Sequence, residues 1–591
     1  MCGIVGWVSV GEKDPTMIEK LASMLRHRGP DSSGFWRSGQ AHLGHTRLSI
    51  IDLTPAADQP MQIGSQVLVY NGEVYNFRDL RREFPGDYVS HGDSEVVLRA
   101  YRALGETALT RFEGMFAFAI WDEATQELFL ARDRFGIKPL YYRPLGDGIA
   151  FASEVAPLLE LGRPDLDWSA LRDFLVYGYV PTPKTPWKGI FKLPAAHYLR
   201  WRAGGFSIQR YWNLEPGSRT ISDERLRGEL DERLRHAIEA SAVADVPLGL
   251  FLSGGTDSAA IACFSSPSIR AFTLHQPERH RDESDHAAAL CRHLGLEHQV
   301  VSSSTVDLPT AVDTMVSVFG EPFGDSAGLA AWLLARAVSR EVKVVLTGEG
   351  GDELFYGYRW HGRAMTCPPS RLAGIGARLL PRLTRPARSN ERRSLEGLER
   401  YAAFVGLFSP AQLGTLLGPV FGGPRAGGDD LFWHLRRFWR EDLPLQQRVQ
   451  FVDFHTYLPD DLLTKVDRAS MAWSLEVRPP LLDHRLVELA VTVEAAMHRD
   501  PLEDRSKRLL RRQIEQRLPA GYLDRPKSGF NLGIRRRVRR HRGLWKEARE
   551  RLYDSGVVGT RRLLDLTNDQ IWALLVLDRW LVVNAPGYGH R

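Results

Sequence analysis

The second residue of the chain, Cys2, has the chemistry of a nucleophile. Removal of Met1 would place its thiol and a free α-amine on the same residue. A thiol must lose its proton before it attacks an amide carbon, and an α-amine with a pKa of about 8 can accept that proton. A single cysteine is more often an inert buried thiol. Cys2 therefore indicates catalysis only in combination with suitable partners elsewhere in the chain.

Four downstream residues could complete such a site. Asn71 and Gly72, in the segment YNGEVYN, can offer a side-chain and a backbone N–H to the oxyanion of a tetrahedral intermediate. Arg47 and Asp93 would match the carboxylate and the ammonium of a free amino acid substrate. Taken alone, Asn-Gly is equally typical of a hairpin turn. Together with Cys2, these residues favour hydrolysis of an amino acid amide.

A second candidate site is the segment SGGTDS, Ser253–Ser258, which joins the apolar run 246–252 to a helical pattern. A loop between a strand and a helix directs backbone N–H groups towards an anion, and glycines let a phosphate approach closely. Asp257 would repel phosphate unless a cation lay between them, which points to Mg²⁺. The alternative is a helix cap with a glycine turn. The Walker pattern GxxxxGK(S/T) is absent, which disfavours ordinary phosphoryl transfer.

A second glycine-rich loop, TGEGGDELF at 347–355, again follows an apolar run, 342–346. It places the carboxylates of Glu349, Asp352 and Glu353 just beyond a strand, where open α/β sheets bind their ligands. We expect Asp257 and Asp352 to share one metal ion.

The pattern of apolar residues divides the chain into two halves. Short apolar or alternating runs such as 67–70 and 115–121 predict a sheet with interspersed helices in the first half. Periodicity is lost at Arg202–Gly205 and at Glu215–Ser218, so we expect a linker there. From Ser222 a helical pattern begins, and the following strand–turn–helix units predict a parallel α/β sheet. Residues 361–450 contain no motif that can be interpreted.

Composition excludes several classes of protein. Of 591 residues, 43% are hydrophobic and 25% are charged, which is typical of a globular protein. The net charge of +5 (77 minus 72) gives no bias towards nucleic acid or an anionic membrane. The basic run Arg535–Arg542 is interpreted as a solvated helix face or an interdomain surface. With four cysteines, no apolar run long enough to span a bilayer and no signal peptide, we expect a protein of the reducing cytoplasm.

The motifs of this chain, and their order along it, resemble those of the glutamine-dependent asparagine synthetases, which are class II glutamine amidotransferases. MCGIVGW, RHRGPDSSG, GHTRLSIIDL, YNGEVYNF, GDSE and ARDRFGIKPLYY follow the glutaminase half, and VPLGLFLSGGTDS, VVLTGEGGDELFYGY, LPDDLLTKVDRASMAWSLEVR and RPKSGF follow the synthetase half. The resemblance implies an α+β N-terminal-nucleophile hydrolase domain, an αββα sandwich, over residues 1–205. It implies an α/β parallel-sheet, Rossmann-like ATP pyrophosphatase domain over residues 222–591, with ammonia passing internally between the two sites.

The resemblance also assigns roles to individual residues. Cys2 resembles the glutaminase nucleophile, with Asn71 and Gly72 as the oxyanion hole. The residues expected to hold glutamine are Arg47, Leu48, Ile51, Asn71, Gly72, Glu73 and Asp93. Those expected to bind ATP are Leu252, Ser253, Gly254, Gly255, Thr256, Asp257, Ser258, Leu274, Thr347 and Gly348, with Asp257 and Asp352 on Mg²⁺. Glu349 resembles the acid that supports acyl-adenylate formation and amine attack, and Lys527 of RPKSGF resembles the lysine that stabilises charge at the α-phosphate.

The chain departs from the family pattern at several positions. The segment Pro194–His197 lacks the usual Pro-Gly before histidine, and Val155 and Ala156 stand where a lysine is usual after FASE. Further departures are Thr347 for the commoner serine, Gly351 for alanine or serine, Pro479 for valine and Leu481 for phenylalanine. They leave the reaction class intact and put the identity of the acceptor in doubt.

The expected function is therefore ATP-dependent amidation of a carboxylate with ammonia from glutamine, with aspartate as acceptor and asparagine, AMP and pyrophosphate as products. The alternative is a tailoring amidotransferase of the same mechanism that acts on another small-molecule carboxylate. Cys2 argues against the related β-lactam-forming cyclases, and SGGTDS excludes amidotransferases with sugar-phosphate or phosphoribosyl domains. A non-catalytic relic is disfavoured because the motifs are intact. The expected partners are glutamine, ATP and the acceptor, without nucleic acid or membrane, and the expected assembly is a homodimer.

Overall fold

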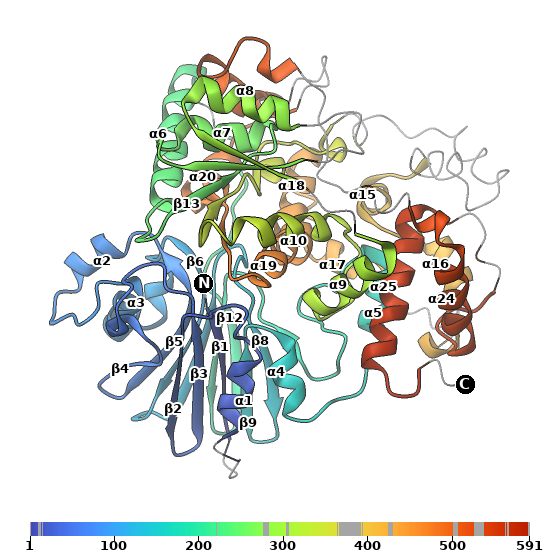
Figure 1. Cartoon of the computed structure of the whole chain (residues 1–591), viewed down its shortest axis with the longest axis horizontal. Coiled ribbons are helices and arrows are strands. Elements are labelled where there is room, and N and C mark those ends of the chain that lie inside the picture. The colour runs from blue at the N-terminus through green and yellow to red at the C-terminus, as the bar shows by residue number, and fades with distance from the viewer. Residues whose placement is uncertain are drawn as a thin grey trace.

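The computed structural model shows two halves that pack side by side (Figure 1). It describes residues 2–9, 14, 16–219, 221–275, 283–302, 306–362, 365, 392, 394–422, 430–499, 506–524, 533, 537–561, 563 and 566–588. Lys527, and Arg535 and Arg536 of the basic run, lie outside the described residues. Among the described residues, no helix is long and apolar enough to cross a membrane.

The first half contains two antiparallel sheets. In spatial order, the first sheet consists of β10 (Phe191–Lys192), β8 (Tyr141–Leu145), β9 (Gly148–Ala152), β1 (Gly3–Val8), β3 (Ala41–Arg47) and β2 (Ser32–Ser38). The second consists of β12 (Gly205–Arg210), β11 (His197–Arg202), β7 (Glu127–Arg132), β6 (Gly114–Asp122), β5 (Gln66–Val74) and β4 (Met61–Ile63). Cys2 immediately precedes β1, and the segment Asn71–Gly72 lies within β5, where it pairs with Phe116 and Ala117 of β6. Asn-Gly is therefore part of a strand and not a hairpin turn.

The two sheets face each other across an apolar core. Alternate residues of β1, β5 and β7, among them Ile4, Val69 and Leu130, are fully buried between the sheets. The outer face of the first sheet packs on α1 (Met17–Ser23) and α4 (Val155–Glu160), and that of the second on α2 (Phe77–Glu83) and α3 (Asp93–Leu104). This arrangement is the αββα sandwich of the N-terminal-nucleophile hydrolases (Figure 1), as predicted.

The second half is built on a parallel sheet of five strands. Their spatial order is β15 (Glu297–Ser302), β14 (Arg270–His275), β13 (Leu248–Phe251), β16 (Val344–Leu346) and β17 (Glu476–Arg478). All four pairings are parallel. Because the chain leaves β13 towards β14 on one side and later adds β16 on the other, the order reverses beside β13. Such a switch point opens a crevice at the carboxyl ends of the strands.

Helices cover both faces of this sheet. One face carries α6 (Asp223–Ser241), α7 (Thr256–Phe264), α8 (Ser284–Leu294), α20 (His484–Ala490) and α22 (Arg508–Ile514). The other carries α10 (Ala327–Val338) and α19 (Thr464–Met471). The helix expected from Ser222 is α6, and Ser222 caps it by accepting a hydrogen bond from the N–H of Arg225. The predicted α/β sheet is confirmed.

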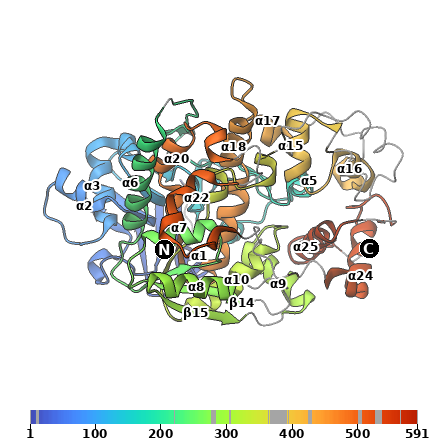
Figure 2. The same ribbon diagram turned by 90° about the horizontal axis from the view of Figure 1, so that it is seen from above.

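The remaining helices surround the sheet of the second half and extend it away from the first two sheets. Those from residues 308 to 498 are α9 (Leu308–Phe319), α11 (Gly351–Leu354), α15 (Gly397–Val405), α16 (Pro410–Leu416), α17 (Trp433–Arg436), α18 (Leu445–His455) and α21 (Ala495–His498). Near the C-terminus are α24 (Arg542–Asp554) and α25 (Asn568–Asn584); α25 packs against α24 and α9, and it lies beside α5 (Trp168–Tyr177) of the first half (Figure 1). Figure 2 shows α16, α24 and α25 at the opposite end of the molecule from α2 and α3.

The expected linker at Arg202–Gly205 was wrong. Arg202 ends β11, Gly205 begins β12, and the two residues pair with each other, so this segment is a hairpin turn. Gly204 and Gly205 have positive φ angles of 102° and 157°, which a tight turn requires. The two glycines also interrupt the alternation of apolar and polar residues, so the strands around the turn are not apparent in the sequence. The chain then crosses to the second half through the irregular residues 211–219.

Buried ion pairs join the two halves. Arg28 of the first half donates two hydrogen bonds, of 2.9 and 3.1 Å, to the carboxylate of Asp467 on α19. Arg468, the next residue, lies 2.7 Å from Glu154 of the first half. Because breaking a buried charge pair leaves an unpaired charge in the interior, these contacts fix the two halves in one relative position.

Candidate functional site

Cys2 and Asn71 meet between the two sheets of the first half. The backbone N–H of Cys2 donates a 3.0 Å hydrogen bond to Oδ1 of Asn71. The Asn71 side chain is fully buried, and among the described residues its Nδ2 has no hydrogen-bond partner. A buried donor without an acceptor is costly, so this amide group is available to an oxygen of a bound molecule. That is the position expected of an oxyanion-hole donor.

The surroundings of Cys2 keep its thiol protonated. Burial raises the pKa of the Cys2 thiol, and the nearby charge of Arg47 and a contact with the Leu48 backbone oppose this rise in part. Cys2 as a whole is 8% exposed. The nucleophile therefore needs a base to form the thiolate.

The other residues expected to hold glutamine surround this point. Arg47, at the end of β3, donates hydrogen bonds to the carbonyl of Thr54 (2.9 Å) and to the carboxylate of Asp58 (2.8 Å). It thereby holds the segment 51–58 against the sheet. Leu48 is buried and Ile51 is half-buried beside it.

Two buried carboxylates lie on the opposite side. Asp93, the first residue of α3, accepts hydrogen bonds from the hydroxyl of Tyr70 (2.6 Å) and the N–H of Val74 (2.9 Å). Glu73 lies next to Asp93, and Glu73 Oε2 has no hydrogen-bond partner among the described residues. Burial raises the pKa of both carboxyl groups, and the charge of Asp93 raises that of Glu73 further. A substrate ammonium placed here would relieve this repulsion.

The SGGTDS loop lies at the carboxyl end of β13, beside the switch point of the parallel sheet. Gly254 has φ of 72°, which turns the chain from the strand into α7. The hydroxyls of Ser253 and Ser258 lie 3.1 Å apart, and Ser258 Oγ also accepts the backbone N–H of Ser253. Two hydroxyls and the first turn of α7 therefore face the crevice, as the sequence predicts for a phosphate site.

The second glycine-rich loop packs directly against the first. A Cβ added to Gly348 would lie 2.8 Å from both Asp257 Cβ and the Ser258 nitrogen, and one added to Gly351 would lie 2.5 Å from the Asp257 carboxylate. At Gly348 the added Cβ would meet backbone, so this position requires glycine. At Gly351 it would meet only side-chain atoms of Asp257 and Leu481, which can shift. Thr347 is fixed by a 2.9 Å hydrogen bond from its N–H to the carbonyl of Arg478.

The two apolar residues expected at the nucleoside end the neighbouring strands. Leu252 follows β13 and Leu274 lies in β14, and both are buried. The hydroxyl of Thr273 donates a 2.7 Å hydrogen bond to the Leu252 carbonyl, which ties the two strand ends together. These side chains form an apolar wall next to the SGGTDS loop.

A lysine that the sequence analysis missed connects the two loops. Lys507, just before α22, directs its ammonium between the carboxylates of Asp257 and Asp352 and lies 2.6 Å from Asp352 Oδ1. Its neighbours, SKRLLRR, are typical of a basic helix face, so nothing in the sequence singled it out. The two carboxylates thus lie on either side of one ammonium group, and a metal ion shared between them stays a prediction.

The donor set fits a magnesium ion only in part. Mg²⁺ is usually held by one or two carboxylates together with substrate phosphates and water, and Asp257 and Asp352 would meet that need. Among the described residues, no group of three or more His, Cys, Asp or Glu side chains could hold a metal ion without other ligands. A Mg²⁺ ion at this place therefore requires phosphate ligands.

Glu349 lies half-buried at the same loop, and burial raises the pKa of its carboxyl group. The charge of Lys465 opposes this rise in pKa. The sequence analysis quoted the motif that contains Lys465 but did not single out this residue. Lys465 is buried on α19 and its ammonium lies 3.0 Å from Asp325. A carboxyl group whose pKa is raised is a stronger base than an ordinary carboxylate and can accept a proton during amine attack. Lys527 lies outside the described residues.

Comparison with known proteins agrees with both halves of the structure. The glutamine amidotransferase domain model matches residues 1–212, and the asparagine synthase model matches residues 229–581. A protein of Mycobacterium tuberculosis, provisionally named as a glutamine-hydrolysing asparagine synthetase, is 34% identical over 91% of this chain and 88% of its own length. Asparagine synthetase (glutamine-hydrolysing) 1 of Bacillus subtilis is 28% identical over 99% of this chain and 97% of its own. Amidase chry2 of Gibberella zeae is 33% identical over 58% of this chain and 55% of its own.

The two sites, their order along the chain and these relatives lead to one assignment. A glutamine amidotransferase domain precedes a synthetase domain with a phosphate-type loop at its switch point, and asparagine synthetases use ATP as a substrate. The chain belongs to the family of glutamine-hydrolysing asparagine synthetases and is a glutamine-dependent carbon–nitrogen ligase.

Proposed function

We propose that this enzyme converts aspartate to asparagine, with glutamine as the source of nitrogen and ATP as the source of energy. The observation that carries the proposal is the coexistence in one chain of a buried Cys2–Asn71 pair and of two interlocked glycine loops at the switch point of a parallel sheet. Each arrangement serves one half of an amidotransferase reaction.

In the first half-reaction, Cys2 Sγ attacks the Cδ of glutamine after its proton passes to the α-amine that Met1 removal exposes. The oxyanion accepts hydrogen bonds from Asn71 Nδ2 and the Gly72 N–H. Collapse of the intermediate expels ammonia and leaves a thioester, which water hydrolyses to glutamate. Arg47 is assigned to the substrate carboxylate, and Glu73 and Asp93 to its ammonium.

In the second half-reaction, a carboxylate oxygen of the acceptor attacks the α-phosphorus of ATP, and pyrophosphate leaves. Ser253, Ser258 and the N–H groups that begin α7 are assigned to the pyrophosphate. Ammonia then attacks the acyl carbon, loses a proton and displaces AMP. We assign Glu349 to the proton and Lys527 to the charge at the α-phosphate.

Lys507, Asp257 and Asp352 shape the charge around the phosphates. Lys507 neutralises Asp257 and Asp352, so the loop does not repel an incoming polyphosphate. When Mg²⁺ is bound with ATP, we assign it to the same two carboxylates, where it would neutralise phosphate charge. Ammonia is expected to pass inside the protein from Cys2 to Glu349.

A second candidate acceptor is a small-molecule carboxylate other than aspartate. It is favoured by the departures at Pro479 and Leu481 and by the similarity to the fungal amidase chry2. The test is pyrophosphate release with ATP, Mg²⁺ and glutamine, with and without aspartate, followed by mass analysis. Aspartate-dependent release with asparagine formed supports the proposal. Glutaminase activity without aspartate-dependent pyrophosphate release excludes aspartate as the acceptor.

We also expect a homodimer located in the cytoplasm, where cysteines stay reduced. Light scattering behind size exclusion would measure the assembly. A monomeric mass would contradict it.

A further inference from the structure

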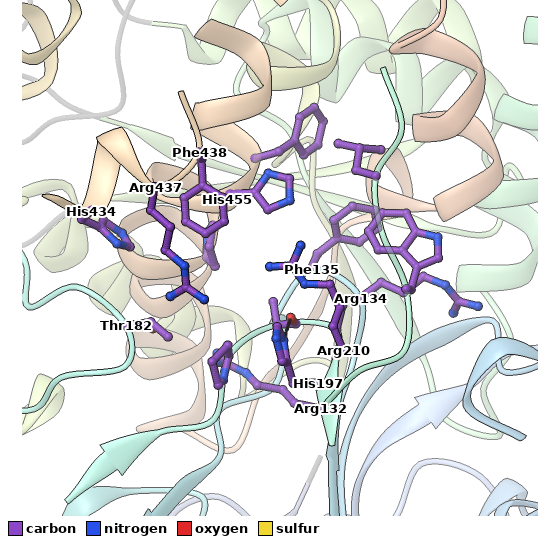
Figure 3. Close-up of a pocket in the computed structure, with 17 residues that line it drawn as sticks. Arg132, Arg134, Phe135, Thr182, His197, Arg210, His434, Arg437, Phe438 and His455 are labelled. Atoms are coloured by element: carbon purple, nitrogen blue, oxygen red, sulfur yellow. Dashed lines mark hydrogen bonds between the residues drawn. The ribbon is translucent and has the colours of Figure 1, made fainter. Parts of the chain in front are cut away.

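A pocket separate from both sites lies at the junction of the two halves (Figure 3). One wall belongs to the first half, near β11 and the end of β12. The opposite wall belongs to α18 and the residues that follow α17. Its cavity has a volume of about 50 Å³ and is partly open to solvent. It includes Pro194–His197, the segment that departs from the family pattern.

The lining is strongly basic. Of the 17 described residues that line the pocket, four are arginines and three are histidines, and none is aspartate or glutamate. An excess of positive charge in one partly enclosed space is unfavourable unless an anion compensates it. The pocket is therefore suited to an anionic ligand.

Two of the arginines are free to bind such a ligand. Arg437 has no ion pair or side-chain hydrogen bond among the described residues, and its guanidinium lies 5.3 Å from the centre of the Phe438 ring. Arg210 donates one hydrogen bond, of 3.0 Å, to the side chain of Asn213, which carries no charge. The two guanidiniums repel each other, and this repulsion together with burial lowers the pKa of Arg210.

The other two arginines are already used. Arg132 donates hydrogen bonds to three backbone carbonyls, those of Gly136, Lys138 and Leu193. Arg134 donates to the carbonyls of Thr110 and Phe112. Their charges remain and add to the positive potential of the pocket, although their donors serve the protein.

Two histidines complete the pocket with hydrogen-bond acceptors. Nδ1 of His197 lies 2.7 Å from the Ala195 carbonyl, and Nδ1 of His455 lies 2.8 Å from the Phe451 carbonyl. Because a carbonyl only accepts, Nδ1 must carry the proton in both rings, and Nε2 of each neutral ring is an acceptor. Burial and the nearby arginines lower the pKa of both rings to about 4, so both are neutral at pH 7.

A ligand for this pocket must therefore accept hydrogen bonds from arginine and donate a hydrogen bond to histidine. Sulfate and carboxylates carry no proton at neutral pH, so they can only accept hydrogen bonds. A hydrogen phosphate group has both charged oxygens and an O–H, and its oxygens point in four directions, towards both walls. We propose that the pocket binds a hydrogen phosphate group between Arg210 and Arg437, with its O–H donated to His197 or His455.

Occupation of the pocket would have a structural consequence. Arg210 and His197 belong to the first half, and Arg437 and His455 belong to the second. One phosphate group would thus bridge the halves and strengthen their association. The rings of Phe135 and Trp212, whose centres are 5.3 Å apart, line the same space and offer a surface to the organic part of a phosphate monoester. The site does not depend on the proposed acceptor.

The test is calorimetric titration of the full-length enzyme with inorganic phosphate, compared with Arg437→Gln and Arg210→Gln. Loss of one charge-assisted contact lowers affinity about tenfold to a hundredfold. Phosphate can also bind the Ser253–Ser258 loop, but that contribution is the same in all variants. The matched control is Arg78→Gln, which removes an exposed arginine of α2 far from the pocket. Unchanged titration of both pocket variants would overturn the proposal.

Titrations with other anions identify the chemical class of the ligand. Sulfate should bind at least tenfold more weakly than phosphate because it cannot donate to histidine; equal binding would overturn the role of the histidines. AMP and phosphate are compared at about pH 5.5, where the monoester, whose second pKa is about 6, still carries the O–H that histidine accepts; loss of binding of either in Arg437→Gln supports the site. Binding of glutamate without phosphate would overturn the ligand class. Unchanged melting temperature and pyrophosphate release without phosphate show that the variants are folded.

Discussion

The guanidinium of Arg478, on β17 of the second half, lies 3.4 Å from the carboxylate of Glu73, on β5 of the first half. The same arginine donates a 2.5 Å hydrogen bond to Glu476, and its backbone carbonyl accepts the N–H of Thr347. One fully buried residue therefore contacts the candidate glutamine site with its side chain and the candidate ATP loop with its backbone. Arg478 thus connects the two candidate sites directly.

Arg478→Gln should destabilise the enzyme and weaken glutamine binding. Removing the arginine leaves Glu73 and Glu476 buried without their counter-charge, which costs about 3–5 kcal/mol. The urea midpoint should fall and the KM for glutamine should rise, because a protonated Glu73 attracts the substrate ammonium less. The control is Arg219→Gln, which breaks the partly exposed pair with Glu229 and should cost about 1 kcal/mol or less. Equal effects of both variants would contradict this account.

Cys2→Ala should abolish the use of glutamine while free ammonium still supports amide formation. The substitution removes the attacking sulfur and leaves the second site, which draws on other residues, intact. Amide product is measured with each nitrogen source in turn. Equal loss of both activities would show that the two sites are not separate.

Lys507→Gln should reduce pyrophosphate release by about a hundredfold or more. The change removes the ammonium that the carboxylates of Asp257 and Asp352 share with the magnesium ion assigned to them, so negative charge is compensated less fully at the step where charge develops on the phosphates. The rate of pyrophosphate formation at saturating ATP is the readout. Lys343→Gln, which removes a surface pair with Asp31, serves as control. Wild-type release by the Lys507 variant would remove this lysine from the site.

His45 should make the enzyme sensitive to acid. It is buried on β3, and burial lowers the pKa of its ring to about 3, below the ordinary value of 6.5. Below pH 6.5 the unfolded chain binds a proton that the folded chain refuses, so the free energy of unfolding decreases as the pH falls from 6.5 towards 3. His45→Gln should flatten this part of the stability curve, measured by urea unfolding at several pH values. An unchanged slope would assign the acid sensitivity to other groups.

Ala196→Gly should stabilise the protein. Ala196 has φ of 59°, a left-handed conformation that costs a residue with a Cβ about 1 kcal/mol and glycine nothing. The same exchange at Ala331, inside α10, should destabilise by about 1 kcal/mol, because a helix interior favours alanine. Melting temperatures of the two variants should therefore move in opposite directions. A lower value for the Ala196 variant would mean that its buried methyl group outweighs the strain.

The sequence by itself determined the class of each site. Glycines at fixed offsets after an apolar run specify a turn into a helix, as at Gly254, and such local geometry depends on neighbouring residues alone. The period of apolar residues likewise predicts strands and helices, and it failed at Arg202–Gly205 because two glycines interrupt a hairpin. No local pattern places Asn71 beside Cys2; we expected the two residues to meet because a thiol nucleophile needs an oxyanion donor.

The tertiary structure alone decided which distant residues meet. Along the chain, Lys507 is 250 positions from Asp257 and Arg478 is 405 positions from Glu73. The phosphate pocket likewise joins residues of both halves. No local pattern encodes such meetings, because they depend on the path of the whole chain and on the burial that forces each charge to find a partner.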